Sequence, residues 1–162
     1  MKKEFLDYCS NIGFQQNAKQ IKALDLLIAF YNESNRSRNN FLNFFNNKSK
    51  KLGFYLYGDV GVGKTMLINF FFDRLKISKQ RIHFNEFMIS FHDFRHNQKF
   101  QGNDTSIETF VKTLKKDIDI IYLDEFQVTN IVDAMILGKL FEKIFKENIK
   151  ILITSNVKIE DL

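Results

Sequence analysis

The sequence contains no proline, no tryptophan and a single cysteine, Cys9. One cysteine excludes a disulfide framework and any zinc site built on paired cysteines, so we expect Cys9 to be a small, half-buried residue. No apolar run approaches the roughly 18 residues that a membrane-spanning helix needs. The two lysines near the N-terminus have no apolar run behind them, so we expect no secretory signal. These absences favour a protein of the cytoplasm.

Hydrophobic residues make up 44% of the 162 residues, enough for one domain with a sizeable core. The net charge of +5 is unevenly placed, because residues 1–53 hold nine Lys or Arg against four Asp or Glu, whereas residues 54–162 hold fifteen of each. A basic first third can attract an acidic partner, an anionic membrane surface or nucleic acid. The lysines of residues 48–51 lie in a polar linker, where solvation explains them, and we do not expect nucleic acid as a partner.

Strand-like and helix-like segments alternate along the chain. Apolar residues recur every three or four positions from Ala18 to Tyr31, which indicates an amphipathic helix, whereas residues 32–51 are polar and indicate a loop. We then predict the strands Phe54–Tyr57, Arg81–Phe84, Asp119–Leu123 and Ile149–Thr154, and the helices Lys64–Lys76, Glu86–His96, Ile107–Lys116 and Ile131–Glu147. This alternation is typical of an α/β protein with a mainly parallel sheet covered on both faces. We therefore expect a helical and loop segment at 1–52 and a core at 53–162.

The segment from Gly58 to Thr65 matches the phosphate-loop pattern Gly-x-x-x-x-Gly-Lys-Ser/Thr. It follows a predicted strand and opens a predicted helix, so backbone N–H groups and the helix N-terminus can both attract phosphate. We expect Lys64 to reach the β- and γ-phosphates of ATP and the Thr65 hydroxyl to bind Mg²⁺. The predicted nucleotide-binding residues are Gly58, Asp59, Val60, Gly61, Val62, Gly63, Lys64, Thr65 and Met66. We expect the adenine pocket to draw on residues 14–20, where no decisive pattern occurs.

Two further strands end in polar residues. Ile120–Leu123 is followed by Asp124 and Glu125, and the last predicted strand is followed by Asn156. Because ligands bind at the carboxyl ends of parallel strands, we expect Asp124 to hold Mg²⁺ and Glu125 to orient or deprotonate the attacking water. Asn156 has the position of a residue that hydrogen-bonds the γ-phosphate or that water.

Three other features suggest sites but have simpler explanations. His92 and His96 lie four residues apart on a predicted helix, but Asp93 replaces the glutamate of the zinc-protease pattern and we expect no metal there. The run Phe70–Phe72 is typical of core packing. His83 lies in a predicted buried strand, and we expect it to be a core histidine.

Three stretches of the sequence resemble the ZapE-like ATPases, which are bacterial cell-division proteins with mitochondrial relatives. The stretches are 54–67, Arg81-Ile82-His83-Phe84-Asn85-Glu86-Phe87-Met88 and 123–137, the last of which begins Leu-Asp-Glu-Phe-Gln-Val-Thr. The resemblance implies a three-layer, AAA+-like P-loop NTPase that hydrolyses ATP with Mg²⁺ and remodels a protein partner. In bacteria that partner is the division filament at the inner membrane, so the resemblance implies peripheral membrane association and, for the full-length protein, a homo-oligomer. The resemblance assigns the phosphate loop to nucleotide, Asp124 and Glu125 to catalysis, and Asn156 to the sensor position.

Family members continue past Asn156 with another strand, an arginine finger and a C-terminal region, whereas this sequence stops at Leu162. We therefore expect the sheet to lack its C-terminal strand and Phe54–Tyr57 to form an edge. An arginine finger is worth about 10³–10⁵ in rate. We expect the chain alone to bind nucleotide and to turn it over slowly or not at all.

Two alternatives remain open from the sequence. A nucleotide-binding regulatory fragment would bind ATP and govern a partner with little turnover. A DNA-associated helicase loader of the AAA+ class would share the same three motifs, and salt-dependent DNA affinity carried by residues 48–51 would support it.

Overall fold

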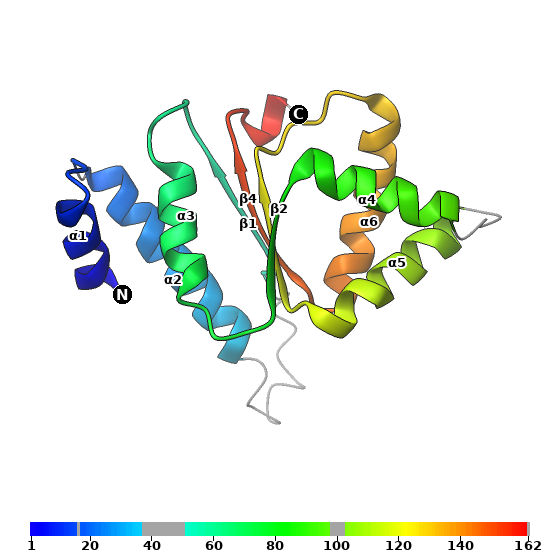
Figure 1. Ribbon diagram of the computed structural model, residues 1–162, viewed down its shortest axis with the longest axis horizontal. Coiled ribbons are helices and arrows are strands. Elements are labelled where there is room, and N and C mark those ends of the chain that lie inside the picture. Colours follow the sequence, from blue (N-terminus) through cyan, green and yellow to red (C-terminus); the bar gives the residue numbers. More distant parts are fainter. Residues whose placement is uncertain (16, 37–50, 98–102, 162) are drawn as a thin grey trace.

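The computed structural model describes residues 1–15, 17–36, 51–97 and 103–161. Its centre is one sheet of four strands: β1 (Gly53–Tyr57), β2 (Lys79–His83), β3 (Ile120–Asp124) and β4 (Lys150–Ser155). The spatial order is β1-β4-β3-β2, and all three pairings are parallel. The sheet lies between two layers of helices (Figure 1), which confirms the predicted three-layer α/β architecture.

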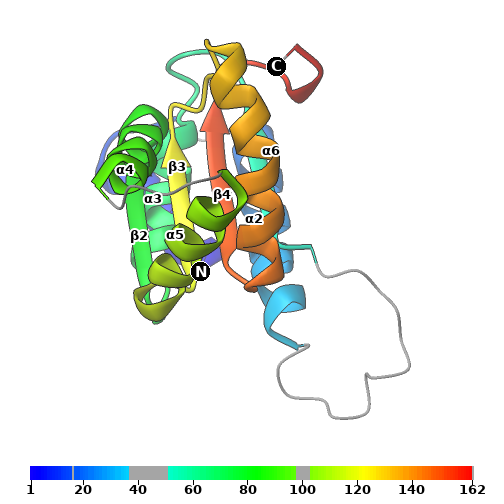
Figure 2. The same cartoon turned by 90° about the vertical axis from the view of Figure 1, so that its right-hand side faces the viewer.

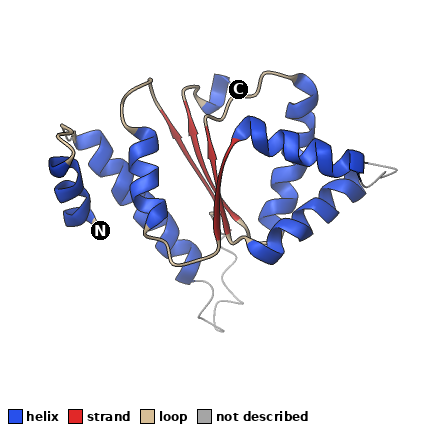
Figure 3. Ribbon diagram, viewed as in Figure 1, coloured by secondary structure: helices blue, strands red, loops and turns tan. Residues whose placement is uncertain are grey.

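The helices divide evenly between the two faces of the sheet. One layer contains α1 (Lys2–Asn11), α2 (Ala18–Arg36) and α3 (Lys64–Asp73), and the other contains α4 (Phe84–Asn97), α5 (Asn103–Asp117) and α6 (Ile131–Lys146). Figure 2 shows β2, β3 and β4 running in the same direction behind α5 and α6. A short 3₁₀ helix, Ile159–Asp161, follows β4 near the same end of the sheet as the α6 N-terminus (Figure 3).

Each face of the sheet has its own hydrophobic core, because successive side chains of a strand point to opposite faces. Ile121, Leu123, Ile151 and Ile153 pack with α4, α5 and α6. Ile120, Tyr122 and Leu152 pack with α1, α2 and α3. The middle strands β3 and β4 are buried at every position, as expected for strands that helices cover on both faces. The predicted core run Phe70–Phe72 is buried in the second core.

Helix α1 is the main element that the sequence did not predict. Its ten residues are mostly charged or polar, and only Phe5 and Cys9 are buried. The Phe5 ring packs edge-on against Phe70 of α3, with ring centroids 5.0 Å apart. Cys9 is fully buried rather than half-buried, and this burial raises the pKa of its thiol. The two buried residues lie one turn apart on one face of the helix, and a single pair of anchors is too short a pattern for sequence-based prediction.

Several predicted boundaries were wrong. The loop expected from Asn32 onward begins later, because α2 continues to Arg36, and the helix expected from Ile107 begins at Asn103. Strand β2 begins two residues and ends one residue earlier than predicted, and Phe84 is the first residue of α4. Residues 48–50, on which the nucleic-acid alternative depended, lie outside the described residues.

Lys79 caps the C-terminal end of α3, which ends at Asp73 rather than at the predicted Lys76. Its ammonium donates to the carbonyl oxygens of Phe72 (2.6 Å), Asp73 (3.0 Å) and Leu75 (3.0 Å). A cation at this end also complements the helix dipole. We expect Lys79→Met to lower the free energy of unfolding by about 1–2 kcal/mol in denaturant titrations. Lys76→Met, at an exposed position, is the matched control, and equal losses for the two variants would contradict this assignment.

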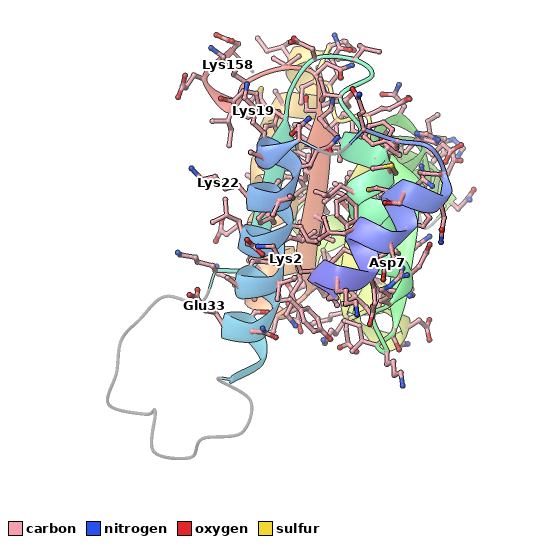
Figure 4. All side chains as sticks on the ribbon, turned by 90° about the vertical axis from the view of Figure 1, so that its left-hand side faces the viewer. Lys2, Asp7, Lys19, Lys22, Glu33 and Lys158 are labelled. Carbon is pink, nitrogen blue, oxygen red and sulfur yellow. The ribbon has the colours of Figure 1, made fainter. Side chains whose placement is uncertain are left out.

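The outer side of α1 and α2 carries charges of both signs. Lys2, Lys19, Lys22 and Lys158 protrude there together with Asp7 and Glu33 (Figure 4). Lys2 donates to Asp25 of α2 at 2.8 Å. This surface of mixed sign differs from the continuous basic stripe that marks a nucleic-acid interface. Within the described part of the chain, every helix is too short or too polar to cross a membrane.

Candidate functional site

The phosphate loop joins β1 to α3 at the carboxyl end of the sheet. Gly61 and Gly63 adopt φ values of 82° and 84°, which L side chains rarely tolerate. Gly63 is the N-cap residue of α3, and no side chain caps that helix end. The backbone N–H groups of the first turn and the positive end of the helix dipole are therefore available to an anion.

Gly63 is also a point of close approach. A Cβ at this position would lie 3.0 Å from both Gln20 Nε2 and Phe14 Cζ, whereas a Cβ at Gly61 would meet nothing within 4 Å. We expect Gly61→Ala to cost about 1–2 kcal/mol of stability from backbone strain alone. Gly63→Ala adds a steric clash to that strain, so it should lower the melting temperature and nucleotide affinity further. Equal melting temperatures and affinities for the two variants would show that the contact with Gln20 and Phe14 has no effect.

The N-terminal layer reaches the loop through a capping box at the start of α2. The Gln20 backbone N–H donates to Asn17 Oδ1 at 2.9 Å, and the Asn17 N–H donates to Gln20 Oε1 at 3.2 Å. The Gln20 amide then donates from Nε2 to the Val62 carbonyl at 3.0 Å. The pattern Asn-x-x-Gln before an amphipathic run could have identified these residues, which the sequence analysis did not single out.

Lys64 lies at the mouth of the loop, with all three of its N–H donors engaged. They donate to the Gly58 carbonyl (2.7 Å), the Asp59 carbonyl (2.8 Å) and Asn156 Oδ1 (2.9 Å). The Asn156 contact joins the end of β4 to the phosphate loop across the sheet edge. Burial lowers the pKa of Lys64 more than the negative charges of Asp59 and Asp124 raise it.

Asp124 ends β3 and its side chain is 3% exposed. Its Oδ1 accepts from Thr65 Oγ1 at 3.3 Å, from the Glu125 backbone N–H at 3.1 Å, and from the Thr154 hydroxyl. Its Oδ2 accepts from Arg81 Nη2 at 2.6 Å. The Tyr122 hydroxyl lies 3.3 Å from Thr154 Oγ1 and extends this buried network into the core beneath α3.

The electrostatics of Asp124 follow from this network. Burial by itself raises the pKa of Asp124, but hydrogen bonds from Thr154, Arg81 and Tyr122 outweigh it, and the pKa lies below its ordinary value. A folded-state pKa below the unfolded one means that ionised Asp124 stabilises the fold at neutral pH. That contribution is lost as the pH falls through the folded pKa. The carboxylate is therefore ionised whenever a cation approaches it near neutral pH.

Glu125 turns away from the buried network. Its φ of 54° places a non-glycine residue in the left-handed region, and its side chain is 78% exposed. Backbone strain of this kind costs on the order of 1 kcal/mol and is concentrated at functional sites. The Phe126 N–H donates to the Thr154 carbonyl at 2.8 Å, and Ser155 Oγ donates to the Phe126 carbonyl at 2.6 Å. These bonds to β4 fix the turn. As a result Asp124 faces the protein interior, whereas Glu125 faces the solvent.

Two cavities meet at Lys64. One of about 260 Å³ is lined by the predicted phosphate, metal and catalytic residues, namely Val60, Gly61, Gly63, Lys64, Thr65, Met66, Asp124, Glu125 and Asn156, together with Thr154 and Ser155. The other, of about 430 Å³, lies between the loop, the start of α2 and the end of β1, and includes Asn17, Lys19, Gln20, Leu56 and Tyr57. The predicted site residues thus all line one or the other of two cavities that share Gly63 and Lys64. A hydroxyl beside a carboxylate, as at Thr65 and Asp124, supplies the oxygen ligands that Mg²⁺ prefers.

Strand β2 contributes two residues that the sequence analysis did not assign to the site. Arg81 contacts Asp124, and His83 Nδ1 lies 3.6 Å from Glu125 Oε2. The prediction that His83 is a core histidine was wrong, because its side chain is 48% exposed at the end of an outer strand. Polar residues alternating with Ile82 at a strand end were the available signal. The other histidine of interest, His92 of α4, contacts Asp133 of α6 at 3.0 Å.

Together, the strand order, the phosphate loop and the acid pair at the end of β3 define a P-loop NTPase of the AAA+-like type. The chain belongs to the AFG1-like ATPase family, whose model matches residues 7–162. This confirms the ZapE-like resemblance, because the cell division protein ZapE of Escherichia coli is 37% identical over 111 residues. The match covers 68% of this chain and 29% of that protein.

Other known proteins agree with this family and fold. Lactation elevated protein 1 homolog B of Danio rerio is 38% identical over 120 residues, which cover 68% of this chain and 24% of that protein. The chain thus spans less than a third of the length of these curated relatives. The solved structure of C. elegans PCH-2 matches with a TM-score of 0.55 and 18% identity over 90% of this chain and 39% of that one. At this identity the likeness concerns the fold alone.

Proposed function

We propose that this chain binds ATP with Mg²⁺ and hydrolyses it to ADP and phosphate. One observation carries the proposal: Lys64 and Thr65 at the start of α3, Asp124 at the end of β3 and Asn156 just after β4 converge on one cavity. Lys64 leaves its loop carbonyls to neutralise the phosphates, and Thr65 and Asp124 hold Mg²⁺. The cation neutralises charge that develops on the phosphates.

In this proposal Glu125 acts on water and Asn156 positions the γ-phosphate or that water. The exposed carboxylate of Glu125 and the amide of Asn156 line the same phosphate cavity. A carboxylate there can accept a proton from the attacking water. We propose that the nucleoside lies in the larger cavity, against Gln20 and Tyr57, and the presence of Asn17, Lys19 and Gln20 in its lining supports the expected adenine pocket at residues 14–20.

The proposal is tested by binding first and turnover second. Titration with a fluorescent ATP analogue should give saturable, Mg²⁺-dependent binding, with unlabelled ATP and GTP as competitors. Phosphate release is then followed under steady-state conditions. Absence of competable nucleotide binding would refute the proposal at its base.

The open position of Glu125 favours a second candidate, a nucleotide-binding regulatory protein with little turnover. A general base that is 78% exposed to solvent lacks the dry surroundings that strengthen catalytic electrostatics. We propose that a neighbouring copy covers this edge in a homo-oligomer, and that the isolated chain turns over slowly. Tight binding without phosphate release, at any protein concentration, would favour the regulatory candidate over the ATPase.

The cellular role is proposed by similarity. ZapE of Escherichia coli is a cell division protein by name. We propose that this chain likewise acts as a cytoplasmic ATPase that remodels a protein partner during division. The division filament is the proposed partner and the inner membrane the proposed site of peripheral association. Co-sedimentation with polymerised division-filament protein, with and without ATP, tests the partner. Salt-dependent DNA binding in place of filament binding would favour the helicase-loader alternative.

A further inference from the structure

Arg81 forms an ion pair with the buried acid of the site, and no pattern in the sequence assigned it a role there. Its Nη2 donates to Asp124 Oδ2 at 2.6 Å, and its guanidinium carbon lies 5.4 Å from the centre of the Tyr122 ring. The two partners differ in exposure: the Arg81 side chain is 41% exposed, whereas that of Asp124 is 3% exposed. The arginine therefore covers a carboxylate that is otherwise enclosed by protein.

The two oxygens of Asp124 have different kinds of partner. Oδ1 accepts hydrogen bonds from neutral donors, the hydroxyls of Thr65 and Thr154 and its neighbour's backbone N–H. Oδ2 accepts from a full positive charge. A divalent cation brought to this carboxylate would meet the guanidinium at contact distance, and two cations so close repel each other strongly even with partial solvent screening.

We propose that Arg81 is the internal counter-cation of Asp124 in the nucleotide-free site, and that Mg²⁺ and Arg81 compete for this carboxylate. The inference rests on the proposed function in naming Mg²⁺ as the competing ion. Arg81 keeps the enclosed carboxylate neutralised while the site is empty, and it leaves when the metal arrives. Arg81 is thus a positioning residue that sets how much metal the site needs.

The exchange is physically accessible because the exposed partner is the one that moves. Arg81 lies on an outer strand and its side chain is partly exposed, so it can turn into solvent, whereas Tyr122 and Thr154 stay buried and keep Oδ1 in place. Lys64 does not take part, since its ammonium donates hydrogen bonds to Gly58, Asp59 and Asn156 instead. Lys64 and Arg81 are thus held by different groups, and their roles can be tested separately.

The test uses the metal alone on the nucleotide-free chain. Thermal unfolding is followed during Mg²⁺ titrations of the wild type, Arg81→Gln and Arg81→Lys. We expect Arg81→Gln to melt at a lower temperature without Mg²⁺ and to recover with half-saturation at about tenfold less Mg²⁺ than the wild type needs. Arg81→Lys keeps the charge and should behave like the wild type. Arg95→Gln, in the last turn of α4, removes an equal charge away from the site and should change neither the melting temperature without Mg²⁺ nor the Mg²⁺ midpoint.

A purely structural role for Arg81 predicts a lower melting temperature with an unchanged Mg²⁺ midpoint, and that result would overturn the proposal. A higher Mg²⁺ midpoint in Arg81→Gln than in the wild type would overturn it too, because it would show that Arg81 promotes metal binding. If Arg81→Gln is unfolded without Mg²⁺, the double variant Arg81→Gln, Asp124→Asn should fold, and its melting temperature should not change with Mg²⁺. Failure of both variants to fold in Mg²⁺ counts against the proposal.

The outcome stays distinct from that of the proposed function. ATP binding by the wild-type chain, measured separately, decides whether the site is a nucleotide site at all. An Arg81-dependent Mg²⁺ midpoint without ATP binding would support the role of Arg81 as counter-cation and refute the proposed ATPase function.

Discussion

Replacing Lys64 by alanine is expected to weaken ATP binding by about 100-fold or more. Among the described residues, Lys64 is the cation that lines both cavities, and its ammonium donates to the Gly58 carbonyl and to Asn156 Oδ1. A charge-assisted hydrogen bond contributes about 1.5–3 kcal/mol, and Lys64 can make such bonds to two phosphates. Isothermal titration with ATP and Mg²⁺ measures the loss.

The same substitution should leave the fold intact. Burial lowers the pKa of Lys64, so holding its charge in the empty site has an energetic cost that alanine removes. We therefore expect the melting temperature without nucleotide to be unchanged or slightly higher. Lys22→Ala, at an exposed position on α2, is the matched control and should bind ATP as the wild type does (Figure 4). Near-normal ATP affinity in Lys64→Ala would remove this lysine from the phosphate site.

Glu125→Gln should abolish most hydrolysis while preserving nucleotide binding. Glutamine keeps the size and hydrogen-bonding reach of the side chain but accepts no proton, so the loss is expected to be about 10²–10⁴-fold in turnover. Binding should be preserved because Lys64 and Thr65 are untouched. Single-turnover assays with radiolabelled ATP detect the reaction even where steady-state turnover is slow.

The exposure of Glu125 makes this variant easy to interpret. Its side chain is mostly exposed and contacts His83 at the surface, so a change in stability is expected to be small. Glu33→Gln, on the outer side of α2, is the control for loss of an exposed glutamate (Figure 4). An unchanged rate in Glu125→Gln would assign proton transfer to another group and reduce Glu125 to a turn residue.

The phosphate loop was predictable because its determinants are local. Two glycines with positive φ, a lysine and a threonine lie within a few residues, between a strand and a helix that the sequence also indicates. Phe54–Tyr57 was also predicted to lie at the edge of the sheet, and among the strands of the described residues β1 is an outer one. The roles of the individual residues remain predictions that the variants above test.

The partners of Asp124 were not predictable in the same way. Arg81 comes from β2 and Thr154 from β4, and only the parallel order of three strands brings them to one carboxylate. His83 was misjudged because strand composition indicates burial, while its place at the end of an outer strand leaves it exposed. Helix α1 was missed because only Phe5 and Cys9, one helical turn apart, are buried among mostly charged and polar residues, and one such pair is a short signal.

The contact between His92 and Asp133 closes a ring through the site. Strand β2 passes directly from His83 into α4, while β3 leads through Glu125 and its held turn to α6, which Asn130 caps. The 3.0 Å bridge then fastens α4 to α6 beyond the sheet edge. Arg81 and Asp124 thus lie on two arms whose far ends are tied together. The ion pair of Arg81 with Asp124 and the contact of His92 with Asp133 therefore join the β2–α4 and β3–α6 segments to each other at two separate places.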